Sequence, residues 1–373
     1  MSGLTVVQLL PALESGGVER STLEIAEALV RAGHRAIVVS VGGRLVPALQ
    51  KSGAEHITLD IGRKSLLTLR HIRTLRDLFL REGADIVHAR SRLPAWLGWK
   101  AVGGIAAARR PRFITTVHGL NSPGHYSAIM TRGERVICVS ESVRQYVLAH
   151  YPRTDPARLR VIPRGIDPSQ FPRRAAPDPE MRAKFAAEHP ALRGSGPLLL
   201  LPGRGTRLKG HASALALLGN LRDAGVDARL WMPGAREAGR EQYLADLENE
   251  AHLGGFGEAL AITPPTSRIA DAYAAADVVL QLSRKPEAFG RTVIEALSVG
   301  RPVVGWAHGG VGELLRELQP RGAVPCFDEG ALLAATRSLL ADPPPPLTTM
   351  PAMYTLRAMQ EATLATYLEL AHA

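Results

Sequence analysis

Short apolar segments alternate with longer amphipathic segments along the whole chain. The first apolar run, Leu4–Leu10, predicts a strand, and Val18–Arg31 predicts a helix because Leu23, Ala26 and Leu29 recur on one side. Apolar runs of this length separated by helical segments are typical of parallel strands that are buried on both faces. The other strands predicted in the first half are Ala36–Val41, His56–Asp60, Asp85–Ala89, Arg112–Val117, Arg135–Ser140 and Arg160–Pro163.

The same pattern restarts after residues 163–179, a segment with five prolines that predicts a hinge. A run of four prolines at 343–346 then precedes a final predicted helix over about Ala352–Leu370. We therefore predict an α/β fold of two Rossmann-like parallel-sheet domains facing a central cleft, with the last helix crossing back to the first domain. The strands predicted in the second half are Leu198–Leu201, Ala228–Met232, Ala259–Ile262, Val278–Leu282, Pro302–Gly305 and Ala323–Phe327.

The length of the chain also favours two domains, because 373 residues exceed what one ordinary core accommodates. We assign residues 1–172 to the first domain, 173–350 to the second, and 351–373 to the helix that packs back. The two cysteines, Cys138 and Cys326, are far apart, which excludes a disulfide framework or a cysteine-rich zinc site. A reducing cytoplasm suits this usage.

The positive charge lies in the first half of the chain. Residues 1–172 hold 24 Lys and Arg against 13 Asp and Glu, whereas residues 173–373 hold 21 against 22. This asymmetry indicates a polyanionic partner of the first domain, such as acidic lipid, phosphorylated glycan or nucleic acid. No signal-peptide pattern is present, and no apolar run reaches the roughly 20 residues of a membrane-spanning helix. We expect a cytoplasmic protein, with the inner face of the cytoplasmic membrane as a second location.

One predicted helix, over residues 65–80, concentrates this charge. Leu66, Leu69 and Ile72 recur at steps of three, so the helix is amphipathic. Basic residues beside apolar ones suit an anionic membrane surface, but a core-facing helix with a solvated basic face, or a polyanionic glycan acceptor, explains them equally well. The basic residues of this region are Arg63, Lys64, Arg70, Arg73, Arg76 and Arg81, followed by Arg90, Arg92 and Lys100 beside Trp96 and Trp99.

Two glycine-containing loops follow predicted strands. Gly16 and Gly17 precede the first helix, where paired glycines let the backbone approach a ligand and free N–H groups face an anion. In the second half, Arg204 and Lys209 lie in the loop that follows Leu198–Leu201 and can clamp a diphosphate. Taken singly, each loop is also compatible with an ordinary solvated turn.

A third loop, residues 284–296, carries two glutamates that flank an apolar pair. Glu287 precedes Phe289 and Gly290, and Glu295 lies on the helix that we expect to begin near Phe289. A carboxylate can accept hydrogen bonds from two neighbouring sugar hydroxyls, and amides at the helix start can hold a phosphate. For two arbitrary glutamates, a pair of surface salt bridges is the simpler interpretation.

Together these segments resemble the retaining glycosyltransferases of GT-B fold, in particular their family 4. The family signature is Glu-x₇-Glu, which Glu287 and Glu295 match with Phe289-Gly290 between them. The likeness spans nearly the whole chain in the order of the family. It includes Gly16-Gly17, Thr115-Thr116-Val117-His118-Gly119, Val139-Ser140-Glu141-Ser142, Pro163-Arg164-Gly165-Ile166-Asp167, Arg204 with Lys209-Gly210, and Gly309-Gly310-Val311-Gly312-Glu313.

The resemblance implies a role for each matching residue. Arg204 and Lys209 would bind the donor diphosphate, together with backbone amides near Gly17 and from Phe289 to Arg291. Glu295 would hold the ribose, Glu287 the transferred sugar, and His118 would lie against that sugar. The first domain would bind the acceptor and the second the donor nucleotide.

The implied reaction moves a hexose from a nucleotide sugar, preferably a UDP-sugar, to a glycan or glycolipid with retention of configuration. Cell-envelope polysaccharide or lipopolysaccharide is the product we expect. No Asp-x-Asp metal motif is present, so no metal or other cofactor is expected. The chain departs from the family at Arg164, where Asn is usual, and at Gly205, where Leu is usual.

Three other functions are to be weighed against this interpretation of the sequence. A non-hydrolysing sugar-nucleotide epimerase shares the fold but lacks the Glu-x₇-Glu pattern. A nucleic-acid-binding protein would suit the basic composition, yet no recognised motif is present and aromatic residues make up only 5% of the chain, so we expect no nucleic-acid partner. An inactive glycan-binding scaffold would not need all of the proposed site residues, yet all are present: Arg204, Lys209, Glu287, Glu295 and His118.

Overall fold

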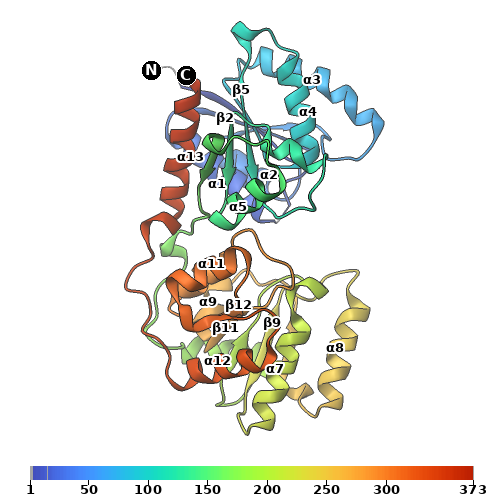
Figure 1. Ribbon diagram of the computed structural model, residues 1–373. Helices are drawn as coiled ribbons and strands as arrows, with labels where there is room; N and C mark the ends of the chain where they lie inside the picture. Colours follow the sequence, from blue (N-terminus) through green and yellow to red (C-terminus); the bar gives the residue numbers. More distant parts are fainter. Residues whose placement is uncertain (1–2, 15, 373) are drawn as a thin grey trace. The chain divides into compact units, whose positions relative to one another are not determined.

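The computed structural model describes residues 3–14 and 16–372, and it forms two compact units (Figure 1). Unit 1 comprises the chain up to Arg164 together with the segment from Leu356 onward, and unit 2 is Gly165–Thr355. Residues 165–172, which we had assigned to the first domain, therefore lie in unit 2. The segment 351–355, which we had grouped with the last helix, lies there as well.

Unit 1 contains a parallel sheet of seven strands in the order β3-β2-β1-β4-β5-β6-β7. Its strands are β1 (Thr5–Leu9), β2 (Arg35–Ser40), β3 (Glu55–Thr58), β4 (Ile86–Ala89), β5 (Arg112–Val117), β6 (Arg135–Cys138) and β7 (Leu159–Val161). Its α-helices are α1 (Gly17–Arg31), α2 (Val46–Lys51), α3 (His71–Arg81), α4 (Arg92–Gly103), α5 (Glu141–His150) and α13 (Leu356–Ala371).

Unit 2 repeats the architecture with six parallel strands in the order β10-β9-β8-β11-β12-β13. The strands are β8 (Leu198–Leu200), β9 (Arg229–Pro233), β10 (Leu260–Thr263), β11 (Val278–Gln281), β12 (Val303–Trp306) and β13 (Ala323–Val324). The helices are α6 (Pro179–Glu188), α7 (His211–Asp223), α8 (Glu241–Leu253), α9 (Ile269–Ala275), α10 (Arg291–Val299), α11 (Gly309–Leu318) and α12 (Glu329–Ala341).

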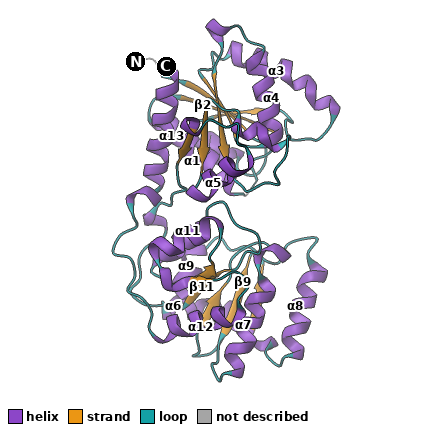
Figure 2. Ribbon diagram, in the orientation of Figure 1, coloured by secondary structure: helices purple, strands orange, loops and turns teal. Residues whose placement is uncertain are grey.

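Helices flank the strands of each unit (Figure 2), which explains why the strands read as continuous apolar runs. In unit 2 the buried side chains of β8, β9 and β11 form one core with α7 and α12. The prediction of two Rossmann-like parallel-sheet domains is confirmed. In each sheet the strand order reverses once, between β1 and β4 in unit 1 and between β8 and β11 in unit 2. Such switch points are where open α/β sheets bind ligands.

The last helix, α13, belongs to unit 1 by its contacts with α1 and β4. Gln360 donates from Nε2 to the carbonyl of Glu24 at 2.8 Å and accepts from Arg31 at 2.7 Å. The hydroxyl of Tyr367 lies 2.6 Å from Nδ1 of His88, a fully buried residue at the end of β4. The C-terminal helix thus contacts a residue that lies next to the switch point of the first sheet.

The basic helix differs from the prediction. Leu66–Arg70 form a short 3₁₀ helix, and α3 begins only at His71. Leu75 and Phe79 are buried, but Leu66 and Leu69 are 86% and 52% exposed, so the prediction that these two leucines lie on the apolar face of one continuous helix is wrong. The physical reason is that these leucines lie in a 3₁₀ helix, which has three residues per turn, so the α-helical period of their spacing does not apply to them.

Candidate functional site

In unit 2, three loops meet beyond the carboxyl ends of β8, β11 and β12. The N–H of Arg284 donates to the carbonyl of Leu208 at 2.8 Å, which joins the loops after β8 and β11. Nε2 of His308 lies 2.9 Å from the carbonyl of Ser283, which joins the loop after β12. The predicted diphosphate loop and the predicted sugar loop are therefore neighbours at the switch point.

Lys209 and Glu287 form the centre of this arrangement. The ammonium of Lys209 lies 2.6 Å from Oε1 of Glu287, and their side chains are 30% and 24% exposed. Ser283 donates from its hydroxyl to the same carboxylate, and Nε2 of Gln281 donates to its other oxygen at 3.4 Å. The pair is fixed by neighbours yet remains accessible, so both groups can exchange partners with a ligand.

Glycines allow the three loops to approach so closely. A Cβ on Gly210, which has φ +80°, would lie 1.9 Å from the carbonyl oxygen of Leu282. A Cβ on Gly310 would lie 2.4 Å from Cα of Phe289, and the Gly310 N–H donates to the carbonyl of Glu287 at 2.8 Å. The glycines after β12 therefore act by holding the Glu287–Phe289 backbone in place.

Glu295 is nearly buried and has its own protein partners. Its carboxylate accepts from the hydroxyl of Tyr273 at 2.9 Å and from Nε of Arg291 at 3.0 Å. Burial and the nearby Glu295 raise the pKa of Tyr273 well above its usual value. The helix that carries Glu295 begins at Arg291, two residues after Phe289, with Gly290 at φ +101° as its N-cap. The left-handed Gly290 ends the loop.

Arg204 is an exposed side chain in the loop after β8. Its neighbour Gly205 is buried, and a Cβ there would lie 2.0 Å from the carbonyl oxygen of Ala235. This contact accounts for the departure from the family at position 205, since no larger residue fits without moving the backbone. The structure brings Lys209 and Glu287 into contact. Arg204 lies exposed in the loop that carries Lys209, and Glu295 lies on α10, where it contacts Tyr273 and Arg291.

In unit 1, the predicted Gly16 and Gly17 lie at the start of α1, and Ser15 lies outside the described residues. Gly16 is the N-cap, in an extended conformation, and as a glycine it has no side chain with which to cap the helix. A Cβ on Gly17 would meet nothing within 4 Å. The carboxylate of Glu19 lies beside Gly16, and the binding of an anion by the first N–H groups of α1 stays a prediction.

His118 follows β5 and contacts Arg164. The guanidinium of Arg164 donates to Nδ1 of His118, and a guanidinium has no acceptor, so the ring proton lies on Nε2. Burial, reinforced by Arg164 and Arg90, holds the pKa of His118 well below its usual value, so the ring is neutral. Nε2 is buried and has no hydrogen-bond partner among the residues that the structure describes.

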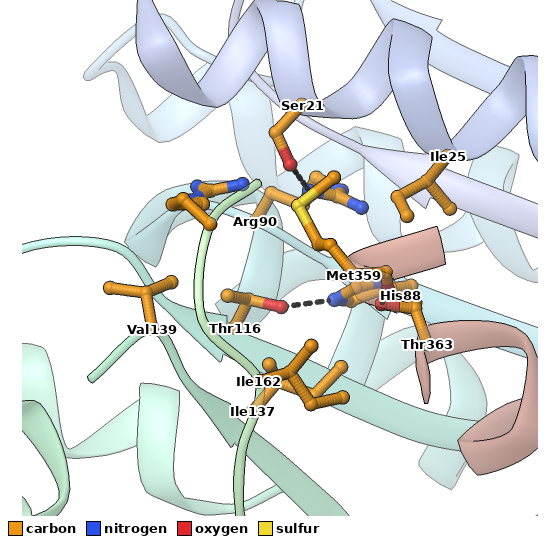
Figure 3. Close-up of a pocket in the computed structure, with 11 residues that line it drawn as sticks. Ser21, Ile25, His88, Arg90, Thr116, Ile137, Val139, Ile162, Met359 and Thr363 are labelled. Atoms are coloured by element: carbon orange, nitrogen blue, oxygen red, sulfur yellow. Dashed lines mark hydrogen bonds between the residues drawn. The ribbon is translucent and has the colours of Figure 1, made fainter. Parts of the chain in front are cut away.

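A second histidine and a second arginine extend this polar cluster (Figure 3). Nε2 of His88 lies 2.7 Å from the hydroxyl of Thr116, and Arg90 donates to the hydroxyl of Ser21 at 3.0 Å. Arg90 is only 4% exposed, so our grouping of it with a membrane-facing surface is wrong. Sequence reasoning missed the roles of His88 and Arg90 here, although their place at the end of a predicted strand was a usable signal.

The cluster borders a pocket of about 220 Å³ at the carboxyl ends of β4 and β5, lined among others by Val18, Arg90, Arg92 and His118.

Over residues 3–14 and 16–372, no three His, Cys, Asp or Glu side chains are grouped as a metal site would require. In the same residues no helix has both the length and the apolar character needed to span a bilayer.

Comparisons with known proteins agree with this architecture. The model of "Glycosyltransferase Family 4" matches residues 15–170, and that of "Glycosyl transferases group 1" matches residues 184–354. A glycosyltransferase structure from Rickettsia africae superimposes with a TM-score of 0.85 and 27% identity, over 99% of each chain.

Other similar proteins align with this chain over only part of their own length. D-inositol 3-phosphate glycosyltransferase 1 of Catenulispora acidiphila is 27% identical over 282 residues, which are 69% of this chain and 64% of the relative. The corresponding enzyme of Xylanimonas cellulosilytica is 35% identical over 156 residues, 41% of this chain and 36% of the relative. The chain thus spans less than two thirds of the length of these relatives. The two family models, the two parallel sheets and the loops at their switch points show that the chain belongs to the family 4 glycosyltransferases of GT-B fold.

Proposed function

We propose that the protein transfers a hexose from a UDP-sugar to a glycan or glycolipid acceptor with retention of anomeric configuration. The observation that carries the proposal is the accessible Lys209–Glu287 pair at the switch point of the second sheet. A cation and a carboxylate at such a place suit the two ends of a nucleotide sugar, its diphosphate and its hydroxyls.

Each group then has a defined task. Lys209 and Arg204 bind the diphosphate and stabilise the negative charge that develops as the sugar leaves. Lys209 moves from Glu287 to the phosphate, and Glu287 becomes free to accept hydrogen bonds from the transferred sugar. Amides of Phe289, Gly290 and Arg291 assist at the start of α10, and Glu295 binds the ribose in exchange for one of its present partners.

His118, as a neutral ring with its proton on Nε2, donates a hydrogen bond to an oxygen of the donor sugar. Gly16 and Gly17 offer backbone amides to the diphosphate. We propose no metal cofactor, because the cationic side chains Arg204 and Lys209 supply positive charge to the leaving group. Chelation with EDTA should therefore leave turnover unchanged, and its loss would contradict this part of the proposal.

The choice of nucleotide and acceptor draws on similar proteins. An Anabaena protein of the same fold, 18% identical with a TM-score of 0.79, has been crystallised with UDP-glucose, so the fold accommodates such a donor. Relatives are named for transfer to D-inositol 3-phosphate, and one from Mycolicibacterium smegmatis is named alpha-maltose-1-phosphate synthase. We propose an envelope glycan or glycolipid as the acceptor class.

The exposed leucines before α3 support a contact with an anionic membrane at the inner face of the cytoplasmic membrane. Leu66, Leu67 and Leu69 are 86%, 71% and 52% exposed. Arg70 and Arg73 are exposed beside them, as are Arg63 and Lys64, whereas Arg76 is half-buried and pairs with Asp77. Apolar side chains ringed by cations suit insertion at a lipid headgroup layer, and each cation contributes about 1 kcal/mol there.

The proposed activity is tested by incubating the full chain with UDP-, GDP- and ADP-glucose and galactose, and by following release of the nucleoside diphosphate. We expect UDP release from one UDP-sugar, increased by an acceptor, and an α-linked product by NMR. Release from none of the donors would contradict the proposal. A β-linked product from an α-donor would contradict retention alone.

A further inference from the structure

The pocket of about 220 Å³ in unit 1 has a marked excess of positive charge. It lies where β4 and β5 end, and its charged side chains are Arg90 and Arg92. Among the described residues, no aspartate or glutamate lines it. Its volume is below the roughly 300 Å³ at which sites for drug-sized ligands begin, so it would take one part of a larger molecule.

The two arginines donate their hydrogen bonds to neutral groups. Arg90 donates from Nε to the side-chain oxygen of Gln8 at 2.8 Å and from Nη1 to the hydroxyl of Ser21 at 3.0 Å. Arg92 donates to the hydroxyl of Ser127 at 3.3 Å, and its guanidinium lies 5.2 Å from the ring centre of Tyr126. Burial lowers the pKa of Arg90 although the charge of Glu24 favours its ionised form, so an anion in the pocket would offset a cost that Glu24 compensates only in part.

Further hydrogen-bond donors line the same pocket. Nε2 of His118, which the proposed function assigns to the transferred sugar, is buried with no partner among the described residues and lines this pocket, so an acceptor bound here would lie beside that sugar. Ser91, the N-cap of the 12-residue helix α4, makes no side-chain capping hydrogen bond within the described residues, and Pro94 has no N–H, so the helix start offers the amides of Arg92 and Leu93. Two arginines and a helix start on one pocket favour a ligand that only accepts hydrogen bonds.

We propose that this pocket binds an anionic oxygen group, a phosphate or a carboxylate, carried by the acceptor. The inference rests on the proposed function, because it describes the acceptor of that transfer. The donor's own diphosphate is assigned there to Arg204 and Lys209 of unit 2. Arg92, which is less buried than Arg90, makes the direct contact, and Arg90 adds charge from behind.

Isothermal titration of the full chain at low salt tests the inference. The probes are inorganic phosphate, glucose 6-phosphate, glucuronate and neutral glucose, with UDP titrated separately. We expect at least one anionic sugar to bind more tightly than glucose. Arg92→Gln should weaken that binding about 10- to 100-fold, as for loss of a charge-assisted hydrogen bond, and leave the Kd for UDP unchanged.

Two variants serve as controls. Arg132→Gln removes an exposed arginine that stacks on Trp99 and does not line the pocket, so it should leave anion binding unchanged. Arg92→Lys keeps the charge without the planar donor fork and should give an intermediate loss. Arg92→Lys also provides the test if Arg92→Gln fails to fold, as judged from its melting temperature.

The outcomes separate the inference from the function on which it rests. Tighter binding of glucose 6-phosphate assigns a phosphate, and tighter binding of glucuronate assigns a carboxylate. Equal binding of glucose and the anionic sugars, or equal loss in Arg132→Gln, overturns the inference. Parallel loss of UDP in Arg92→Gln assigns the pocket to the donor and overturns it too. Absence of UDP binding in the wild type, with Arg92-dependent anion binding intact, contradicts the proposed function alone.

Discussion

Replacing Lys209 by alanine tests whether this residue contributes mainly to turnover or mainly to the stability of the fold. The ammonium of Lys209 lies 2.6 Å from the carboxylate of Glu287, and the two side chains are 30% and 24% exposed to solvent. Such a pair contributes at most about 1 kcal/mol to stability. Glu287 also retains hydrogen bonds from Ser283 and Gln281. We therefore expect the melting temperature of Lys209→Ala to fall by only about 2–4 °C.

The effect on turnover should be much larger. A preorganised donor facing the charge of a leaving group is worth about 2.7–4 kcal/mol in the transition state, a factor of about 10²–10³ in rate. The assay follows UDP release from the preferred UDP-sugar at saturating donor, alongside calorimetric measurement of the Kd for UDP. Arg207→Ala is the matched control, because Arg207 lies two residues away in the same loop, is 74% exposed and faces Asp246.

The result that would refute the reasoning is a rate for Lys209→Ala within about threefold of the wild type, with the fold intact. An equal loss in Arg207→Ala would also refute it, because the loop charge as a whole, and not Lys209, would then carry the effect.

Three further perturbations test other parts of the account. Glu295→Gln should weaken UDP binding about tenfold, since an amide replaces a hydrogen-bonded carboxylate at the proposed ribose site, and an unchanged calorimetric Kd would contradict the ribose role. Charge reversal of Arg70, Arg73 and Arg76 should release the protein from phosphatidylglycerol vesicles in a flotation assay, and retention would dismiss the membrane contact. His211 is buried, and burial lowers its pKa to about 4, so the unfolded chain binds its proton more readily. The free energy of unfolding should therefore decrease as pH falls from about 6.5 to 4, by up to about 3 kcal/mol, and denaturant titrations should show less of this loss in His211→Gln.

Much of the fold could be predicted from the sequence because parallel strands carry a strong local signal. Each predicted strand corresponds to one of the thirteen strands of the described chain, with shifts of a few residues at their ends. The exception among the helices is instructive. Leu66 and Leu69 have the spacing of a buried helical face, yet they lie in the 3₁₀ helix that precedes α3 and are exposed. Spacing alone does not reveal which face has a partner.

Contacts between residues of recognisable motifs could be predicted from the sequence, whereas contacts that depend on how distant segments pack could not. The Glu287–Lys209 neighbourhood follows from the position of both residues after adjacent strands of one sheet. In contrast, the contact of Arg164 with His118 joins residues 46 positions apart and depends on how β5 and the chain after β7 meet. The sequence marked Arg164 as unusual for the family but contained nothing that identified its partner.

The position of the donor site is the central claim, and hydrogen exchange measured by mass spectrometry tests it most directly. The full chain is exchanged with and without saturating UDP. The account predicts slower exchange in peptides covering residues 203–210 and 284–295 of unit 2. UDP binding that leaves both segments unprotected, with protection confined to other parts of the chain, would contradict it.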